Sequence, residues 1–153
     1  MSTALAEQRS VETQMVAFHL AGEIYAMDIA IIHEIILVPE ITHIPRTSPD
    51  MQGVINLRGK IVPVLDLRKR LHLPAKEVTR QTRIIVAEQG DMTVGMVVDD
   101  VVGVIRIANS SIEPPSNLVT SMDTDSILGV GKHHEDLIIL LNMENVLAVA
   151  KTH

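Results

Sequence analysis

The chain has 153 residues, with 13 basic and 19 acidic side chains and a formal net charge of −6. It shows no stripe of lysine and arginine, and Phe18 and Tyr25 are its only aromatic residues apart from histidine, a composition that argues against nucleic-acid binding. It has no cysteine, which excludes disulfides and thiol nucleophiles, and no apolar run of the roughly 18 residues that a membrane span needs, so we expect a cytoplasmic protein without direct membrane insertion.

The first third of the chain favours β-structure. Residues 1–13 are polar and small, and we expect them to be a disordered lead-in. Strand-like alternation begins at Val16 and resumes over 24–27, after a turn at Ala21-Gly22-Glu23. The stretch 28–38 is almost wholly apolar, and its pattern leaves a short helix and a strand both open.

A hairpin followed by a short helix comes next. Residues 54–57 and 61–65 are predicted strands around Arg58-Gly59-Lys60, with glycine in the turn. Asp66 is a good N-cap, and Leu67 and Leu71 lie on one face of the helix that it would begin. The polar stretch 75–81 is typical of a connector.

The second half has the same style. Residues 109–125 are loop-like, and Asn142 is predicted to cap a final helix with Met143, Val146, Leu147 and Ala150 on its apolar face. The strands that we predict here are 83–88, 92–98, 101–107 and 137–141.

An internal repeat connects the two halves. Gly53-Val54 recurs 76 positions later as Gly129-Val130, and at the same spacing the caps Asp66 and Asn142 correspond. Further upstream, Tyr25-Ala26-Met27 matches Val94-Gly95-Met96 at a spacing of 69. The repeat predicts a mainly β fold of two linked small barrels.

Motifs for chemistry are weak. Gly129-Val130-Gly131-Lys132 resembles the end of a phosphate-binding loop, but Ser126 and His133 replace its first glycine and its hydroxyl, so we expect a tight turn between strands. The run His133-His134-Glu135-Asp136 lacks metal-ligand spacing and is predicted to be a solvated turn. We therefore expect neither an enzyme nor a cofactor.

Isolated charges inside apolar segments stand out instead. Glu34 lies within the apolar run 29–36, and Arg58 lies at a predicted hairpin tip. Both are ordinary solvated residues in one interpretation. In the other they form a charged rim beside an apolar groove, which gives an interface its register and specificity.

The run 53–68, GVINLRGKIVPVLDLR, resembles the signature segment of the CheW family, the coupling proteins of bacterial chemotaxis. Residues 18–35 resemble the opening strands of that family, and residues 94–104 resemble its second half. With 127–131, 137–141 and the closing helix following in order, the resemblance covers residues 14–150.

This resemblance implies a fold of two linked, five-stranded β-barrels of the SH3 or OB kind, which exchange elements and carry short helices and a C-terminal helix. Residues 14–150 would form one CheW-like domain, with its midpoint at 75–82. The family has no catalytic activity. It bridges the cytoplasmic signalling tip of methyl-accepting chemotaxis receptors to the regulatory domain of the histidine kinase CheA, and is recruited to membrane-associated receptor arrays.

Two surfaces follow from the resemblance. The receptor-binding groove would involve Ile32, Glu34, Gly53, Arg58, Gly95 and Val104. Glu34 and Arg58 are expected to pair or to face polar receptor groups, and the two glycines to permit close backbone approach or positive φ, unless they merely form a turn or bulge. The contact with the kinase and its ring would involve Leu118, where some relatives have an aromatic residue, with Ile41 and Ile44 as further candidates.

Two other functions stay open on the sequence. A CheW-like interaction module in a non-flagellar receptor-kinase pathway would use the same surface, so only genomic context separates it from chemotaxis. A small-ligand β-barrel binder needs a lined cavity, and the near absence of aromatic residues argues against one.

Overall fold

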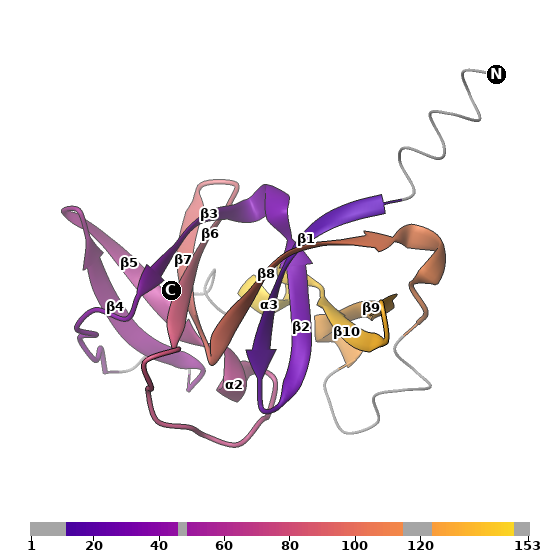
Figure 1. The fold of residues 1–153 in the computed structure, drawn as a ribbon. Helices are drawn as coiled ribbons and strands as arrows, with labels where there is room; N and C mark the ends of the chain where they lie inside the picture. The colour runs from indigo at the N-terminus through magenta and orange to yellow at the C-terminus, as the bar shows by residue number, and fades with distance from the viewer. Residues whose placement is uncertain (1–11, 46–48, 115–123, 149–153) are drawn as a thin grey trace.

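The computed structural model describes residues 12–45, 49–114 and 124–148, which form two five-stranded sheets side by side (Figure 1). The first sheet has the order β8-β1-β2-β10-β9, and the second has the order β3-β6-β7-β5-β4. The bounds in the first sheet are β1 (Glu12–Leu20), β2 (Glu23–Asp28), β8 (Asp100–Ala108), β9 (Ile127–His133) and β10 (Asp136–Leu141). Those in the second are β3 (Ile32–Leu37), β4 (Met51–Leu57), β5 (Lys60–Asp66), β6 (Arg83–Gln89) and β7 (Met92–Val98).

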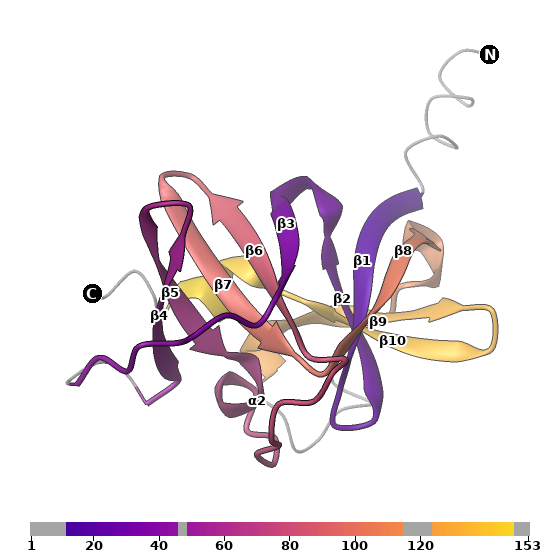
Figure 2. The ribbon, with the colours of Figure 1, turned by 60° about the vertical axis from the view of Figure 1, so that its left-hand side comes forward.

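The strand orders show both the internal repeat and an exchange of strands between the two halves of the chain. Strands β1 to β5 correspond in order to β6 to β10, so the two sheets are the same arrangement of equivalent strands. Each sheet takes two strands from one half of the chain and three from the other (Figure 2). Equivalent parallel pairs, β10 with β2 and β5 with β7, join the two contributions within each sheet.

Two glycines allow equivalent close crossings of the backbone. Thr42, beyond β3, exchanges both backbone hydrogen bonds with Val54 of β4, at 2.9 and 2.8 Å. Glu113, beyond β8, does the same with Val130 of β9, both at 2.8 Å. Gly53 and Gly129 precede those partners, and a Cβ on either would collide with the carbonyl group of the crossing strand. Gly53 and Gly129 recur at a spacing of 76 residues because both crossings require a residue without a Cβ at this position.

Three apolar clusters hold the sheets, because successive strand residues face opposite sides. One cluster fills the first sheet around Ala17, Ile107 and Leu140, and one fills the second around Ile55, Val64 and Ile84. The largest lies between the sheets and contains the stacked rings of Phe18 and Tyr25, 6.2 Å apart. Both aromatic side chains are fully buried, so neither offers a surface for stacking.

The short helices begin at the predicted caps. Asp66 Oδ1 accepts hydrogen bonds from the backbone N–H groups of α2 (Leu67–Arg70), and Asn142 Oδ1 accepts one from Asn145 in α3 (Met143–Val146). Arg70 then joins the two helices by donating to the carbonyl oxygens of Asn145 and Val146. No helix of the described ranges is long and apolar enough to cross a membrane.

Three segments differ from, or refine, the sequence expectations. For the stretch 28–38 the sequence left a short helix and a strand both open, and the structure contains one after the other: a 3-10 turn η1 (Ile29–Ile31) and then β3. The turn predicted at Gly129–Lys132 is wrong, since these residues lie inside β9 and the chain reverses at His134-Glu135. The glycines are needed there because Ile107 and Ile112 pack directly on Gly129 and Gly131. Strand β1 begins at Glu12, inside the expected lead-in.

A buried ion pair ties the halves together. Arg68 of α2 donates from Nε to Asp99 Oδ1 at 2.8 Å and from Nη2 to Oδ2, and the two side chains are 10% and 13% exposed. Asp99 Oδ2 also accepts from the Ala21 N–H, in the β1–β2 turn, at 3.0 Å. One carboxylate thus joins α2, the β1–β2 turn and the β7–β8 link.

This site predicts acid sensitivity. Burial opposes ionisation of Asp99, but the hydrogen bonds from Arg68 and Ala21 and the charge of Arg68 outweigh it, so the pKa of Asp99 lies below its ordinary 3.8. The unfolded chain therefore binds the proton first, and the stabilisation is present above pH 3.8 and lost as pH falls through the folded-state pKa. Urea midpoints measured from about pH 6 to pH 3 should fall more steeply for the wild type than for Asp99→Asn. Equal slopes would contradict this assignment.

Candidate protein-interaction surface

An exposed ion pair lies where β3 faces the β4–β5 hairpin. Arg58 and Gly59 both have positive φ, 52° and 85°, and form the two-residue turn, which Asn56 Oδ1 supports by accepting from the Gly59 N–H at 2.8 Å. This turn directs the Arg58 side chain to Glu34 of β3. Arg58 Nη1 donates to Glu34 Oε1 at 3.2 Å, and Nη2 contacts Oε2. The pair spans the two edge strands of the second sheet.

The Glu34–Arg58 pair fixes the positions of its two side chains more than it stabilises the fold. The hydrogen bond from Arg58 lowers the pKa of Glu34, and its charge acts in the same direction. The same contact raises the pKa of Arg58. Both groups stay ionised at neutral pH, but they lie in solvent, with exposed fractions of 67% for Arg58 and 24% for Glu34. Solvated pairs add little to folding. What the pair provides is a fixed bidentate geometry that a polar partner group can address.

His33 and Glu88 extend this charged rim, and the sequence did not indicate them. His33 Nδ1 lies 3.3 Å from Glu88 Oε1, and its Nε2 lies 3.6 Å from Glu34 Oε2. The contact depends on the register of β3 against β6, where Glu34 opposes Val86. A bulge between Ile32 and Glu34 shifts that register. The contact of His33 with Glu88 therefore cannot be predicted without knowing how β3 pairs with β6.

Apolar side chains accompany the charges on β3. Ile35 and Leu37 are exposed by 40% and 69%, whereas Ile32 is half-buried and packs against the cluster between the sheets. The predicted run 29–36 therefore supplies both a buried and an exposed apolar face. This combination of apolar strand and charged rim is what protein interfaces commonly use.

The two predicted glycines lie beneath the surface. Gly53 is buried, and the close approach expected there is present, but its partner is the Thr42 backbone of this chain. Gly95 is also buried, and a Cβ there would lie 2.9 Å from Cγ2 of Ile84. Both support the strands that carry Glu34 and Arg58, and neither presents a face to solvent.

The remaining candidates are dispersed. Val104 is 57% exposed but lies on β8, the edge strand of the first sheet. Ile41 is half-buried against the interior of the second sheet, and Ile44 is 37% exposed. Leu118 lies outside the described residues. The described part of the chain holds no cluster of three or more metal-ligating side chains.

A fold of two strand-exchanged sheets with a charged rim beside an apolar edge strand defines an interaction domain, and a family model described as the CheW-like domain matches residues 14–151. The chain therefore belongs to the CheW family. A chemotaxis protein CheW of Bacillus subtilis (strain 168) is 38% identical over 135 residues, 88% of this chain and 86% of that protein. The CheW of Klebsiella aerogenes is 32% identical, covering 94% and 92%.

A solved structure agrees with these relatives. The scaffolding protein TtCheW of Thermoanaerobacter tengcongensis superimposes with a TM-score of 0.81 at 39% identity, covering 89% of this chain and 92% of that one. The coverage is high in both directions. The matches therefore extend over most of the length of each protein.

Proposed function

We propose that this chain is a chemotaxis scaffold that couples methyl-accepting receptors to the regulatory domain of the histidine kinase CheA, without catalysing a reaction. The observation that carries the proposal is the exposed Glu34–Arg58 pair beside the apolar edge strand β3, in a chain that the CheW-like family model matches from 14 to 151. The protein would work in the cytoplasm, recruited to receptor arrays at the membrane.

The receptor tip is proposed to bind along β3 and the β4–β5 hairpin. Glu34 and Arg58 would position polar receptor groups, and Ile32 would lie at the apolar floor. Gly53 and Gly95 would contribute indirectly, by keeping the strands in place. Val104, on the other sheet, would mark the far side of this groove.

The kinase is proposed to bind elsewhere. Ile41 and Ile44, in the segment between β3 and β4, and Leu118 would contact the CheA regulatory domain and its ring neighbours. A scaffold couples its partners only if the receptor's signalling states differ in free energy within the complex. Separate surfaces for the two partners make such a three-component complex possible.

Each sheet is further proposed to be a closed, swapped β-barrel within a single domain over 14–150. The paired ladders leave β3 and β4, and β8 and β9, as edges in the part of the chain that is described. The crossings at Thr42–Val54 and Glu113–Val130 join each pair of edges and would form the seam.

Calorimetry tests the scaffold assignment. The full chain is titrated separately with a receptor signalling-tip fragment and with the CheA regulatory domain from the same genome. Saturable binding to each, and binding of one in the presence of the other, is expected. Binding to neither partner would refute the proposal, and binding to the kinase domain alone would remove the receptor half of it.

Arg58→Glu is predicted to weaken receptor binding about tenfold while the fold stays intact, because the new carboxylate would repel Glu34 at an exposed position. Arg80→Glu is the matched control, since Arg80 is exposed in the 75–81 connector and carries the same charge. The exchange Glu34→Arg with Arg58→Glu should recover part of the affinity. Unchanged binding, with a normal circular dichroism spectrum, would show that Arg58 is outside the interface.

A further inference from the structure

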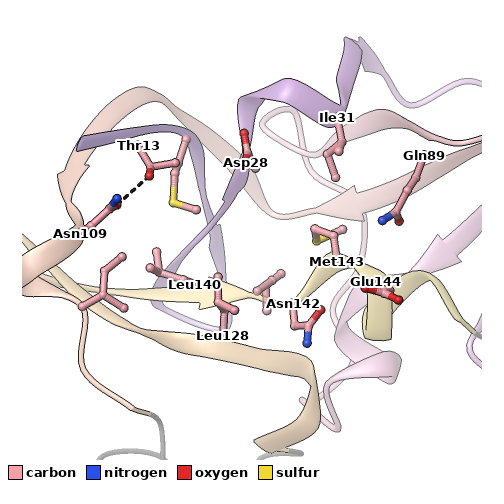
Figure 3. A pocket seen from close by; sticks show the side chains of 13 residues that line it. Thr13, Asp28, Ile31, Gln89, Asn109, Leu128, Leu140, Asn142, Met143 and Glu144 are labelled. Atoms are coloured by element: carbon pink, nitrogen blue, oxygen red, sulfur yellow. Dashed lines mark hydrogen bonds between the residues drawn. The ribbon is translucent and has the colours of Figure 1, made fainter. Parts of the chain in front are cut away.

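A half-open pocket of about 350 Å³ lies where the ends of β1 and β2 meet β9, β10 and α3 (Figure 3). Its walls include the apolar side chains of Met15, Ile31 and Met143. Asp28, Gln89 and Glu144 supply polar groups around it. None of the described residues of the proposed receptor and kinase surfaces lines this pocket, so it lies apart from them.

The internal repeat supplies an equivalent pocket in the other half. That pocket, by α2, has a volume of only about 50 Å³. The spacings of 69 and 76 relate five lining positions of the two pockets, namely Thr13 to Thr82, Asp28 to Val97, Gln52 to Leu128, Asp66 to Asn142 and Arg68 to Glu144. The two pockets therefore lie at equivalent positions of the two repeats and are lined by different side chains.

The small pocket is narrowed by an arginine of the chain itself, which forms part of its wall. Arg68 lines it and is held by Asp99, with a further hydrogen bond from Nη1 to the Pro74 carbonyl oxygen. At the equivalent position the other half has Glu144, which is exposed. None of the described residues lining the large pocket is a lysine, arginine or histidine. One half thus fills this place with a guanidinium, and the other leaves it open and lined by acceptors.

The acceptors of the large pocket suit the same chemical group. Gln89 Oε1 is buried and has no hydrogen-bond partner in the described part of the chain, a costly state for an amide oxygen. Asp28 and Glu144 add two carboxylates. A guanidinium offers several N–H donors in one plane to such a set, and its aliphatic stem can pack on the methionine and isoleucine walls.

We infer that this pocket receives an arginine side chain presented by a partner protein, which takes the place that Arg68 fills in the other half. The inference rests on the proposed function only in that the chain acts by docking to other proteins. The occupant is charge-complementary to the pocket and to the net charge of −6. It would add a third contact to the scaffold, at the junction of the two sheets.

The probe is the blocked dipeptide acetyl-leucyl-arginine amide, titrated into the full chain and followed by the NMR methyl signals of Met15 and Met143. Saturable shifts of both are expected. The isosteric citrulline peptide, which lacks the charge, should cause much smaller shifts. No shift with the arginine peptide, or equal shifts with both peptides, would overturn the inference. Because neither receptor nor kinase is used, failure here is distinguishable from failure of the scaffold assignment.

Two variants locate the site. Glu144→Gln should weaken arginine-peptide binding about fivefold, whereas Glu135→Gln, at the exposed β9–β10 turn, should leave it unchanged. Glu144→Arg recreates the occupied half and should abolish binding, with the fold retained because the position is exposed. Equal effects of the two glutamine variants would contradict the pocket assignment.

Discussion

Replacing Gly53 by alanine is expected to lower the free energy of unfolding by about 2–4 kcal/mol. The added Cβ would overlap the Thr42 carbonyl group, with its carbon only 2.9 Å away, and φ at this position is +155°. Relief requires the segment beyond β3 to move off β4, which breaks the two hydrogen bonds of the Thr42–Val54 crossing. Overpacking, backbone strain and lost hydrogen bonds therefore act together.

Gly22→Ala is the matched control for this experiment. Gly22 also has positive φ, +83°, but nothing lies within 4 Å of its added Cβ, so only backbone strain of about 1 kcal/mol is expected. Urea unfolding of the two variants measures the difference. If Gly53→Ala is no less stable than Gly22→Ala, the crossing is not a tight one. In that case, any loss of receptor binding by Gly53→Ala would have to arise from a direct change in the receptor-binding surface of this chain.

Replacing Arg68 by methionine is expected to cost about 3 kcal/mol, because it leaves the Asp99 carboxylate buried without its counter-charge. The loss also removes the hydrogen bond to Pro74 that holds the start of the connector. Methionine keeps much of the apolar stem, so the effect reports mainly on the charge and its hydrogen bonds.

The Glu34–Arg58 pair serves as a control, because it joins the same chemical groups as the Arg68–Asp99 pair but lies in solvent. Arg58→Met removes the other bidentate arginine–carboxylate contact, Glu34–Arg58, which lies in solvent. It should leave the free energy of unfolding almost unchanged, because the solvated pair adds little to folding. Denaturant midpoints of both variants, measured at neutral pH, make the comparison. Similar losses for Arg58→Met and Arg68→Met would show that burial does not set the value of these pairs.

Local signals predicted much of the fold. The caps Asp66 and Asn142 and the Arg58-Gly59 turn are confirmed, because each depends on a few neighbouring residues and their preferred φ values. The repeat spacings of 69 and 76 also hold, since they reflect equivalent strands. The expected pairing of Glu34 with Arg58 is present as well.

The failures involve distant segments. Gly129 and Gly131 match a turn pattern because glycine is the usual turn signal, yet their role is to admit Ile107 of β8 and Ile112 of the segment that follows it. The His33–Glu88 contact depends on a bulged register, and the pocket at α3 is lined by many separate elements, among them β1, β2, β6, β9 and β10. None of these has a signature in adjacent residues. The repeat, once combined with the structure, did relate the two pockets.

The exchange of strands between the halves has a consequence for how the chain is made. A nascent chain that has emerged only as far as residue 81 carries β1 to β5, yet these belong to two different sheets and neither sheet is complete. The pairing of β2 with β10 closes only after residue 141 has left the ribosome. Folding must therefore wait for nearly the entire polypeptide, which leaves strand edges unpaired during synthesis and makes two neighbouring nascent copies competitors for each other's strands.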